Sequence, residues 1–159
     1  MRTMTGEDLI RLATENVEAW SLGDWERLKA PFSSDVVYLE LGTQRTLRGL
    51  DQLVETYKSW KLSIPDGTGR VVSSLASGNT VVLEVIWSGT QTGPIQTPGG
   101  VVPASGKSFT LAAAQVITFR DGKIIEFRHY FDMLTMLQQI GAVPKPAGAE
   151  TKEEIAAGM

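Results

Sequence analysis

The chain has 159 residues, of which 42% are hydrophobic and 21% are charged, and this size and composition favour a single globular domain. A formal net charge of −3 and scattered basic residues argue against nucleic-acid binding. The absence of cysteine excludes disulfides and thiolate chemistry. Because no apolar run reaches membrane-spanning length and no signal-peptide pattern stands at the start, we expect a cytoplasmic protein without membrane contact.

The first part of the sequence predicts three helices and a small hairpin. Apolar residues recur there at three- and four-residue spacing, and capping residues and glycine breaks separate the periodic segments. The predicted elements are a helix with apolar residues from Leu9 to Trp20, a short helix after Asp24, a hairpin over residues 36–41 and 43–48, and a helix between Gly49 and Pro65.

The second part of the sequence predicts an antiparallel sheet. β-branched and aromatic residues dominate it, and tight-turn signals at residues 77–79 and 121–122 separate neighbouring strands. A Gly- and Pro-rich connection over residues 89–106 is unusually long, and such loops are often functional. Helices on one face of such a sheet form an α+β fold that can enclose a pocket. The predicted strands cover residues 71–75, 80–87, 107–119 and 123–131, and a short helix over residues 132–140 follows them.

The last hairpin predicts which side chains share a face of the sheet. A two-residue turn at Asp121-Gly122 pairs Arg120 with Lys123, and an unbroken ladder then brings Gln115 opposite Arg128. A β-bulge would end this register. Alternation places Gln115, Arg128, Tyr130 and Asp132 on one face, and Phe127, His129 and Phe131 on the other.

The face with Gln115 combines apolar side chains, a few polar groups and the small Ala113, which is the pattern of a ligand pocket. We expect it beneath the helices, around a small hydrophobic ligand. The opposite face is apolar and needs a cover of its own, so we predict a homodimer through the sheet face with Phe127 and Phe131. Because His129 falls on this second face, a His129–Asp132 dyad is not expected.

Three segments of the chain resemble one known family: AWSLGDWERLKAPFSSDVVYLE, WSGTQTGPIQTPGGVVPASGK and DGKIIEFRHYFDMLTMLQQIG. They are similar to SnoaL-like polyketide cyclases and ester cyclases of the nuclear transport factor 2-like superfamily, over about residues 7 to 144. The resemblance implies a cystatin-like curved antiparallel sheet with N-terminal helices that form a cone-shaped pocket. It implies a SnoaL-like domain over residues 1–146, and we expect residues 147–159 to be a flexible tail.

The resemblance also implies a catalytic group. In polyketide cyclases of this kind, an aspartate at the end of the last strand is the general acid/base of a cofactor-free aldol ring closure, and Asp132 matches it in position and flanking motif. We therefore predict catalysis by Asp132, with Arg128 neutralising an enolate oxygen and Tyr130 donating to a carbonyl oxygen. The alternatives are that Asp132 caps the following helix and that Arg128 forms a structural ion pair with Glu126 or Asp132.

Six further side chains are predicted to contact a substrate. Aromatic side chains can form pocket walls, although helical spacing also fits Tyr57 and Trp60 into a plain core. The Gln115 amide can orient a substrate oxygen or satisfy Arg128 instead. Gln91 stands in GTQTG, where many members of the resembled family have histidine. The set is Gln115, Tyr38, Tyr57, Trp60, Trp87 and Gln91.

These expectations define an enzyme that uses a carboxylate on a hydrophobic carbonyl compound, most simply in aldol-type polyketide cyclisation. We expect no cofactor and no metal, since one histidine and no cysteine leave few ligands. The alternatives are an epoxide hydrolase with Glu84 or Glu126 as a second acid, a ketosteroid-isomerase-like activity, and a non-catalytic dimer that binds a small molecule. The fold alone does not decide among them.

Overall fold

The computed structural model describes residues 3–144 and residue 158, so the predicted tail, apart from Gly158, lies outside the described residues. The helices are α1 (Gly6–Leu22), α2 (Trp25–Lys29), α3 (Leu50–Ser63) and α4 (Met133–Gln139). The strands are β1 (Phe32–Glu40), β2 (Arg45–Arg48), β3 (Thr68–Ser77), β4 (Thr80–Thr90), β5 (Ile95–Thr97), β6 (Gly100–Val102), β7 (Ser108–Arg120) and β8 (Lys123–Phe131).

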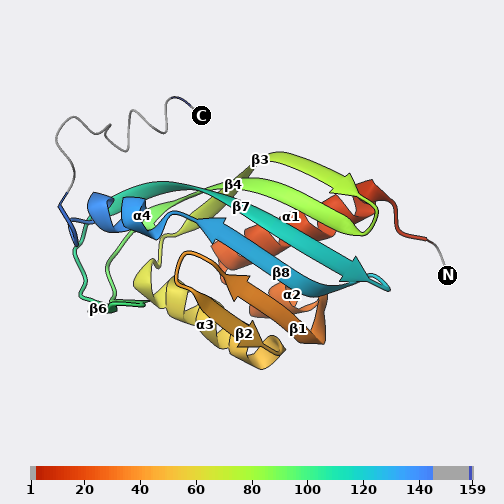
Figure 1. The fold of residues 1–159 in the computed structure, drawn as a ribbon, viewed down its shortest axis with the longest axis horizontal. Helices are drawn as coiled ribbons and strands as arrows, with labels where there is room; N and C mark the ends of the chain where they lie inside the picture. The colour runs from red at the N-terminus through yellow and green to blue at the C-terminus, as the bar shows by residue number, and fades with distance from the viewer. Residues whose placement is uncertain (1–2, 145–157, 159) are drawn as a thin grey trace.

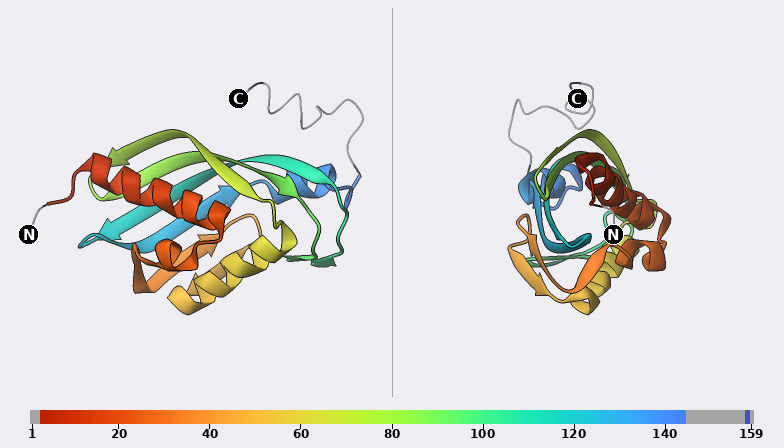
Figure 2. Two further views of the ribbon diagram at one scale, coloured as in Figure 1. Left: turned by 180° about the vertical axis from the view of Figure 1, so that it is seen from behind. Right: turned by 90° about the vertical axis from the view of Figure 1, so that its right-hand side faces the viewer.

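Six strands form one curved sheet in the order β2-β1-β8-β7-β4-β3 (Figure 1). Viewed along the long axis of the molecule, the sheet curls around an interior, and the helices α1, α2 and α3 close its open side (Figure 2). Helix α1 packs against β3 and β4, whereas α3 packs against β1 and β2. The α+β architecture with a curved sheet and N-terminal helices, which the sequence predicts, is confirmed.

Local sequence explains where the first helix begins and ends. The Thr5 hydroxyl accepts the Asp8 backbone N–H, and the Asp8 carboxylate accepts the Thr5 N–H, so two otherwise unpaired donors are satisfied. Gly23 ends the helix with φ +70°, a conformation that L side chains rarely adopt. The apolar side chains between these two caps, among them Ala13 and Val17, are buried against the sheet.

The sheet differs from the predicted antiparallel arrangement in two places. Strand β1 pairs with β8 in parallel, because a pattern of β-forming residues carries no information about strand direction. The long connection after β4 contains a small antiparallel hairpin, β5 with β6, which the sequence analysis did not predict. Its strands have only three residues each, too few for a periodic signal.

A β-bulge in β8 reverses the predicted faces of that strand. Arg120 pairs with Lys123 and Phe119 with Ile124 as expected, but Thr118 pairs with Glu126, which leaves Ile125 without a partner. The bulge has a physical cause. Ile124 and Phe127 are three residues apart and both fully buried, and one extra residue must lie between them for both to face inward.

The bulge changes the partner of Gln115, which is His129 and not Arg128. Strand β8 therefore turns Phe127, His129 and Phe131 inward, and the predicted arrangement of these faces is wrong. Phe127 lies in the core with 0% exposure, so it cannot form the predicted dimer surface. A homodimer itself stays a prediction.

Candidate functional site

A pocket lies between the inner face of the sheet and the helices. It has about 660 Å³ of empty space, part of it open to solvent, and its lining is mostly apolar. A mostly apolar lining with a few polar groups is typical of a site for a small hydrophobic molecule. The phenylalanine, tyrosine and tryptophan side chains in the lining are Trp20, Tyr38, Tyr57, Trp60, Trp87, Phe109 and Phe131.

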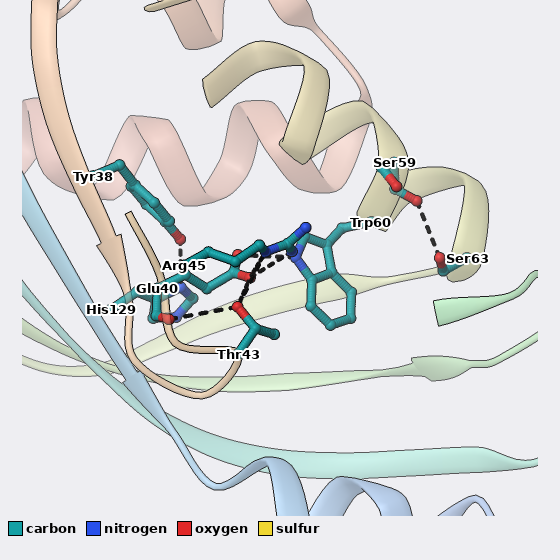
Figure 3. Close-up of polar contacts among 8 residues, drawn as sticks. All are labelled: Tyr38, Glu40, Thr43, Arg45, Ser59, Trp60, Ser63 and His129. Carbon is teal, nitrogen blue, oxygen red and sulfur yellow. Dashed lines mark hydrogen bonds and ion pairs between the residues drawn. The ribbon is translucent and has the colours of Figure 1, made fainter. Parts of the chain in front are cut away.

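His129 is held between two aromatic hydrogen-bond partners inside this pocket. Its Nδ1 lies 2.8 Å from the Tyr38 hydroxyl oxygen (Figure 3). Its Nε2 accepts the Trp87 indole N–H at 3.3 Å. Burial lowers the pKa of His129 to about 3, because a charged imidazolium is poorly solvated in this apolar surrounding. The ring is therefore neutral at physiological pH.

The indole partner fixes the tautomer of the imidazole. An indole N–H can only donate, so Nε2 of His129 carries no proton and the single proton of the neutral ring sits on Nδ1. The Tyr38 oxygen must then accept from Nδ1–H, and its own hydrogen is left to donate elsewhere. The neighbours for that hydrogen are Tyr57, whose ring meets Tyr38 edge to face with centroids 5.5 Å apart, and any ligand in the pocket.

Both tyrosine hydroxyls are held in the protonated form. Burial raises the pKa of Tyr38 well above its ordinary value, and burial also raises the pKa of Tyr57. A hydroxyl that stays protonated and faces an apolar cavity is a hydrogen-bond donor for a ligand oxygen. Such a preorganised donor stabilises the negative charge that develops on a carbonyl oxygen during proton abstraction.

Glu40, at the end of β1, is the carboxylate in the described pocket lining. Its Oε1 accepts from Arg45 at 3.0 Å from Nε and 2.5 Å from Nη2, and also from the Thr43 hydroxyl. Its Oε2 accepts the Trp60 indole N–H at 3.0 Å. Because a carboxylate oxygen can accept two hydrogen bonds, Oε2 has one acceptor position left (Figure 3).

Strand pairing brings the Glu40 group and the His129 group together. Glu40 and Tyr38 are two residues apart on β1 and so face the same side of the sheet, and Glu40 is the register partner of His129 on β8. Strands β1 and β8 therefore bring a carboxylate, a neutral imidazole and the Tyr38 phenol together in the pocket, and the Tyr57 phenol reaches the pocket from α3. This combination suits proton transfer on a hydrophobic carbonyl compound.

The three predicted catalytic residues lie outside this pocket lining, which corrects the expectation that they point inward. Arg128 forms an ion pair with Glu126 at 2.6 Å on the outer face of β8, and Tyr130 on the same face is 44% exposed. Asp132 is exposed and caps α4, where its Oδ1 accepts the Thr135 backbone N–H at 3.2 Å. The cap and the ion pair are the structural alternatives that the sequence left open.

The pKa of Asp132 also argues against the predicted catalytic role. The Thr135 hydroxyl donates to its Oδ2 at 2.6 Å, and this hydrogen bond lowers the pKa of the carboxyl below its ordinary value. A carboxylate that serves as a general base is most effective when its pKa is raised toward the working pH, which is the opposite shift. Asp132 therefore stabilises a helix end and has no direct access to the pocket.

Removal of this cap gives a testable outcome. Replacing Asp132 by alanine should lower the free energy of unfolding by about 1 kcal/mol, measured by urea denaturation, because two hydrogen bonds to Thr135 are lost. Ligand binding in the pocket should stay unchanged. An Asp132→Ala protein that is folded, binds ligand and has lost all turnover would restore the original assignment.

Of the six predicted substrate-contacting residues, five lie in the pocket lining, namely Gln115, Tyr38, Tyr57, Trp60 and Trp87. Gln91 does not. Its buried amide donates to the Gly93 and Pro103 carbonyls at 2.9 and 3.1 Å and accepts the Ser105 N–H at 3.0 Å. These three hydrogen bonds hold together the two ends of the connection that contains β5 and β6.

Sequence reasoning missed Glu40 and placed His129 on the wrong face. A signal for the second was present, since the spacing of Ile124 and Phe127 fits a single buried face only with a bulge. The sequence gives a weaker indication that Glu40 belongs to the pocket, and this residue is defined only by its position. It ends a run of β-forming residues at an inward position, two residues after Tyr38.

The part of the chain that the structure describes, residues 3–144 and 158, contains neither a metal-binding cluster nor a membrane-spanning helix. No cluster of three or more His, Cys, Asp or Glu side chains suited to a metal ion occurs there. In the same residues, no helix combines the length and the apolar character needed to span a bilayer.

Solved structures with the same fold place the chain in a structural class. A proposed SnoaL-like polyketide cyclase from Jannaschia sp. CCS1 matches with a TM-score of 0.78 at 19% identity, covering 91% of this chain and 99% of the other. An LEH-like epoxide hydrolase from M. tuberculosis matches with a TM-score of 0.66 at 18% identity, covering 86% and 92%. The chain therefore has the ketosteroid isomerase-like, or nuclear transport factor 2-like, fold.

A narrower assignment follows from the sequence. The family model for SnoaL-like polyketide cyclase matches residues 10–140, so the chain belongs to this family. IdmH from Streptomyces antibioticus, a proposed polyketide cyclase, is 26% identical with a TM-score of 0.71, covering 84% of this chain and 98% of the other. No curated protein matches the sequence.

Proposed function

We propose that this protein is an enzyme that takes a proton from the carbon next to a carbonyl group of a hydrophobic substrate, in an aldol-type polyketide cyclisation. The observation that supports this proposal is the shared pocket wall, where the Glu40 carboxylate lies beside the His129 and Tyr38 pair. The base and the oxyanion donors of such a reaction must reach adjacent atoms of one substrate, and neighbouring strands provide that proximity.

The proposed reaction needs no cofactor. Glu40 Oε2 accepts the proton, and the electron pair of the broken C–H bond forms an enolate whose oxygen accepts from Tyr38 or Tyr57. The enolate carbon then attacks a second carbonyl of the same substrate and forms a C–C bond. The resulting alkoxide takes the proton back from Glu40, so substrate and product have the same composition.

The role of His129 in this proposal is to position Tyr38. A neutral imidazole with Trp87 on one nitrogen and Tyr38 on the other has no proton to exchange with the substrate. By donating to the Tyr38 oxygen it directs the phenol hydrogen away from the imidazole, toward Tyr57 and the ligand. His129 is therefore a positioning residue.

The described pocket lining gives little support to epoxide hydrolysis by two carboxylates. Glu84 is exposed on the outer face of β4, and Glu126 is paired with Arg128, also on the outer face. A ketosteroid-isomerase-like double-bond shift begins with the same proton abstraction and differs only in where the proton returns. Analysis of products separates it from cyclisation.

Deuterium exchange tests the proton-abstraction step without knowledge of the natural substrate. The probe is 1-tetralone, a bicyclic aryl ketone, incubated in D₂O and followed by ¹H NMR at the carbon next to the carbonyl. We expect the protein to accelerate exchange, because general base catalysis contributes roughly 10² to 10⁴ in rate.

Quenching of tryptophan fluorescence reports binding of the same ketone, since Trp20, Trp60 and Trp87 line the pocket. Binding without any acceleration of exchange would contradict the proposed function and favour a non-catalytic binding protein. Exchange together with incorporation of ¹⁸O from labelled water into an epoxide probe would favour the hydrolase instead.

A further inference from the structure

The Gln115 side chain lines the pocket and carries an acceptor without a hydrogen-bond partner. The residue is 2% exposed, lies on the inner face of β7 and belongs to the pocket lining. Its Oε1 is the one buried side-chain nitrogen or oxygen atom without a hydrogen-bond partner in the part of the chain that the structure describes. Buried polar atoms are almost always paired, so this exception needs an explanation.

No neighbour of Gln115 in the sheet can supply the missing donor. Its register partner on β4 is the apolar Leu83, and its partner on β8 is His129. The two ring nitrogens of His129 already serve Tyr38 and Trp87. The adjacent inward-facing residues of its own strand, Ala113 and Ile117, are apolar.

Within the sheet, the Gln115 acceptor therefore has no partner, and the space next to the residue is the pocket that it lines. An amide placed there for stability alone would be paired, because an unpaired buried acceptor weakens the folded state. A ligand that enters the pocket with a hydroxyl group would satisfy it.

We propose that Gln115 selects substrates that carry a hydroxyl group, phenolic or enolic, on their apolar ring system, and that Oε1 accepts a hydrogen bond from it. This inference rests on the pocket being the substrate site of the proposed function. It adds the substrate feature that the pocket recognises, at the residue that lies next to His129 on the side away from Glu40. A site built to bond a hydroxyl rejects an analogue that lacks it, since its own polar group is then left unpaired.

The test compares 1-tetralone with 5-, 6- and 7-hydroxy-1-tetralone by isothermal titration calorimetry. We expect at least one hydroxylated ketone to bind the wild-type protein about 10-fold more tightly than 1-tetralone, which corresponds to 1.4 kcal/mol. The variant Gln115→Met keeps the side-chain volume and removes the acceptor, so it should bind all four ketones with similar affinity. The control Gln96→Met changes an exposed glutamine of β5 and should keep the preference.

A second readout uses the protein without ligand. Gln115→Met should melt at the same temperature as the wild type or higher, because the unpaired acceptor is gone. A melting temperature lowered by several degrees would overturn the inference, since it would reveal a structural partner for Gln115. Equal affinity of the wild type for all four ketones would overturn it as well.

The exchange and binding experiments distinguish a failure of the proposed function from a failure of the proposed role of Gln115. Accelerated exchange of 1-tetralone without any hydroxyl preference contradicts the role of Gln115 and leaves the proposed function standing. A hydroxyl preference that depends on Gln115 without accelerated exchange supports the role of Gln115 in binding and contradicts the proposed function.

Discussion

Replacing Glu40 by glutamine should reduce the acceleration of 1-tetralone exchange by a factor of about 10² to 10⁴. The amide keeps the shape of the side chain and one acceptor oxygen, so it can accept from Arg45 or from Trp60 but not from both, and it cannot take up a proton at neutral pH. The expected loss is large because Glu40 is the carboxylate in the described pocket lining. The measurement is the exchange rate by ¹H NMR at saturating ketone.

Glu84→Gln is the matched control for this experiment. It makes the same chemical change on the outer face of β4, where the carboxylate is exposed and accepts from Ser73. Exchange should proceed at the wild-type rate in this variant. Because Glu40→Gln also breaks a buried ion pair, ligand binding by fluorescence must show that its pocket is intact. An intact Glu40→Gln protein with the wild-type exchange rate would remove Glu40 from the mechanism.

The second large effect concerns stability in acid. The folded-state pKa of His129 is lowered from 6.5 to about 3, so the folded protein favours the neutral ring more than the unfolded chain does. The stability gained is fully present above pH 6.5 and is lost as the pH falls from 6.5 toward 3. One pKa unit is worth about 1.4 kcal/mol, so the full loss is about 4 to 5 kcal/mol.

His129→Gln isolates this contribution from the titration of the carboxyl groups. Its amide N–H can donate to Tyr38 and its carbonyl can accept from Trp87, but it does not titrate. Between pH 7 and pH 4.5, the free energy of unfolding in urea should fall by about 2.5 kcal/mol more for the wild type than for the variant. Equal losses in the two proteins would mean that the imidazole is not buried in the neutral form.

The sequence allows the elements and the fold class to be predicted because the signals that determine them are local. Capping at Thr5, the helical spacing up to Trp20 and the turn at Asp121-Gly122 each depend on a few neighbouring residues. The aromatic pocket residues follow from the same patterns, since Tyr38, Tyr57, Trp60 and Trp87 lie on inward faces of correctly predicted elements.

The prediction that Arg128 and Tyr130 face the pocket was wrong because it depended on register over several residues. A single bulged residue, Ile125, exchanges the two faces of β8 from there to its end, so an otherwise correct turn placed Arg128 and Tyr130 inward. Burying both Ile124 and Phe127 is worth roughly 1.5 to 3 kcal/mol for each side chain, which favours the bulge over the regular ladder. This balance is a tertiary effect, and no turn motif reports it.

The roles of single polar residues could be predicted even less. The tautomer of His129 depends on Trp87, which is 42 residues away in the chain, and the free acceptor of Gln115 is defined by the absence of a neighbour in space. The proximity of Glu40 to His129 requires the parallel pairing of β1 with β8, which no sequence pattern indicates. These features become visible only once the strands are placed.

The position and the protonation of the only histidine test the account most directly. With ¹⁵N-labelled protein, NMR of the imidazole nitrogens should show the proton on Nδ1, a bare Nε2 and no titration between pH 8 and pH 4.5. Such a result places the ring between Trp87 and Tyr38 inside the pocket, as the bulge requires. A ring that titrates near pH 6.5 would mean that β8 turns its histidine outward, and the pocket wall described for this protein would not exist.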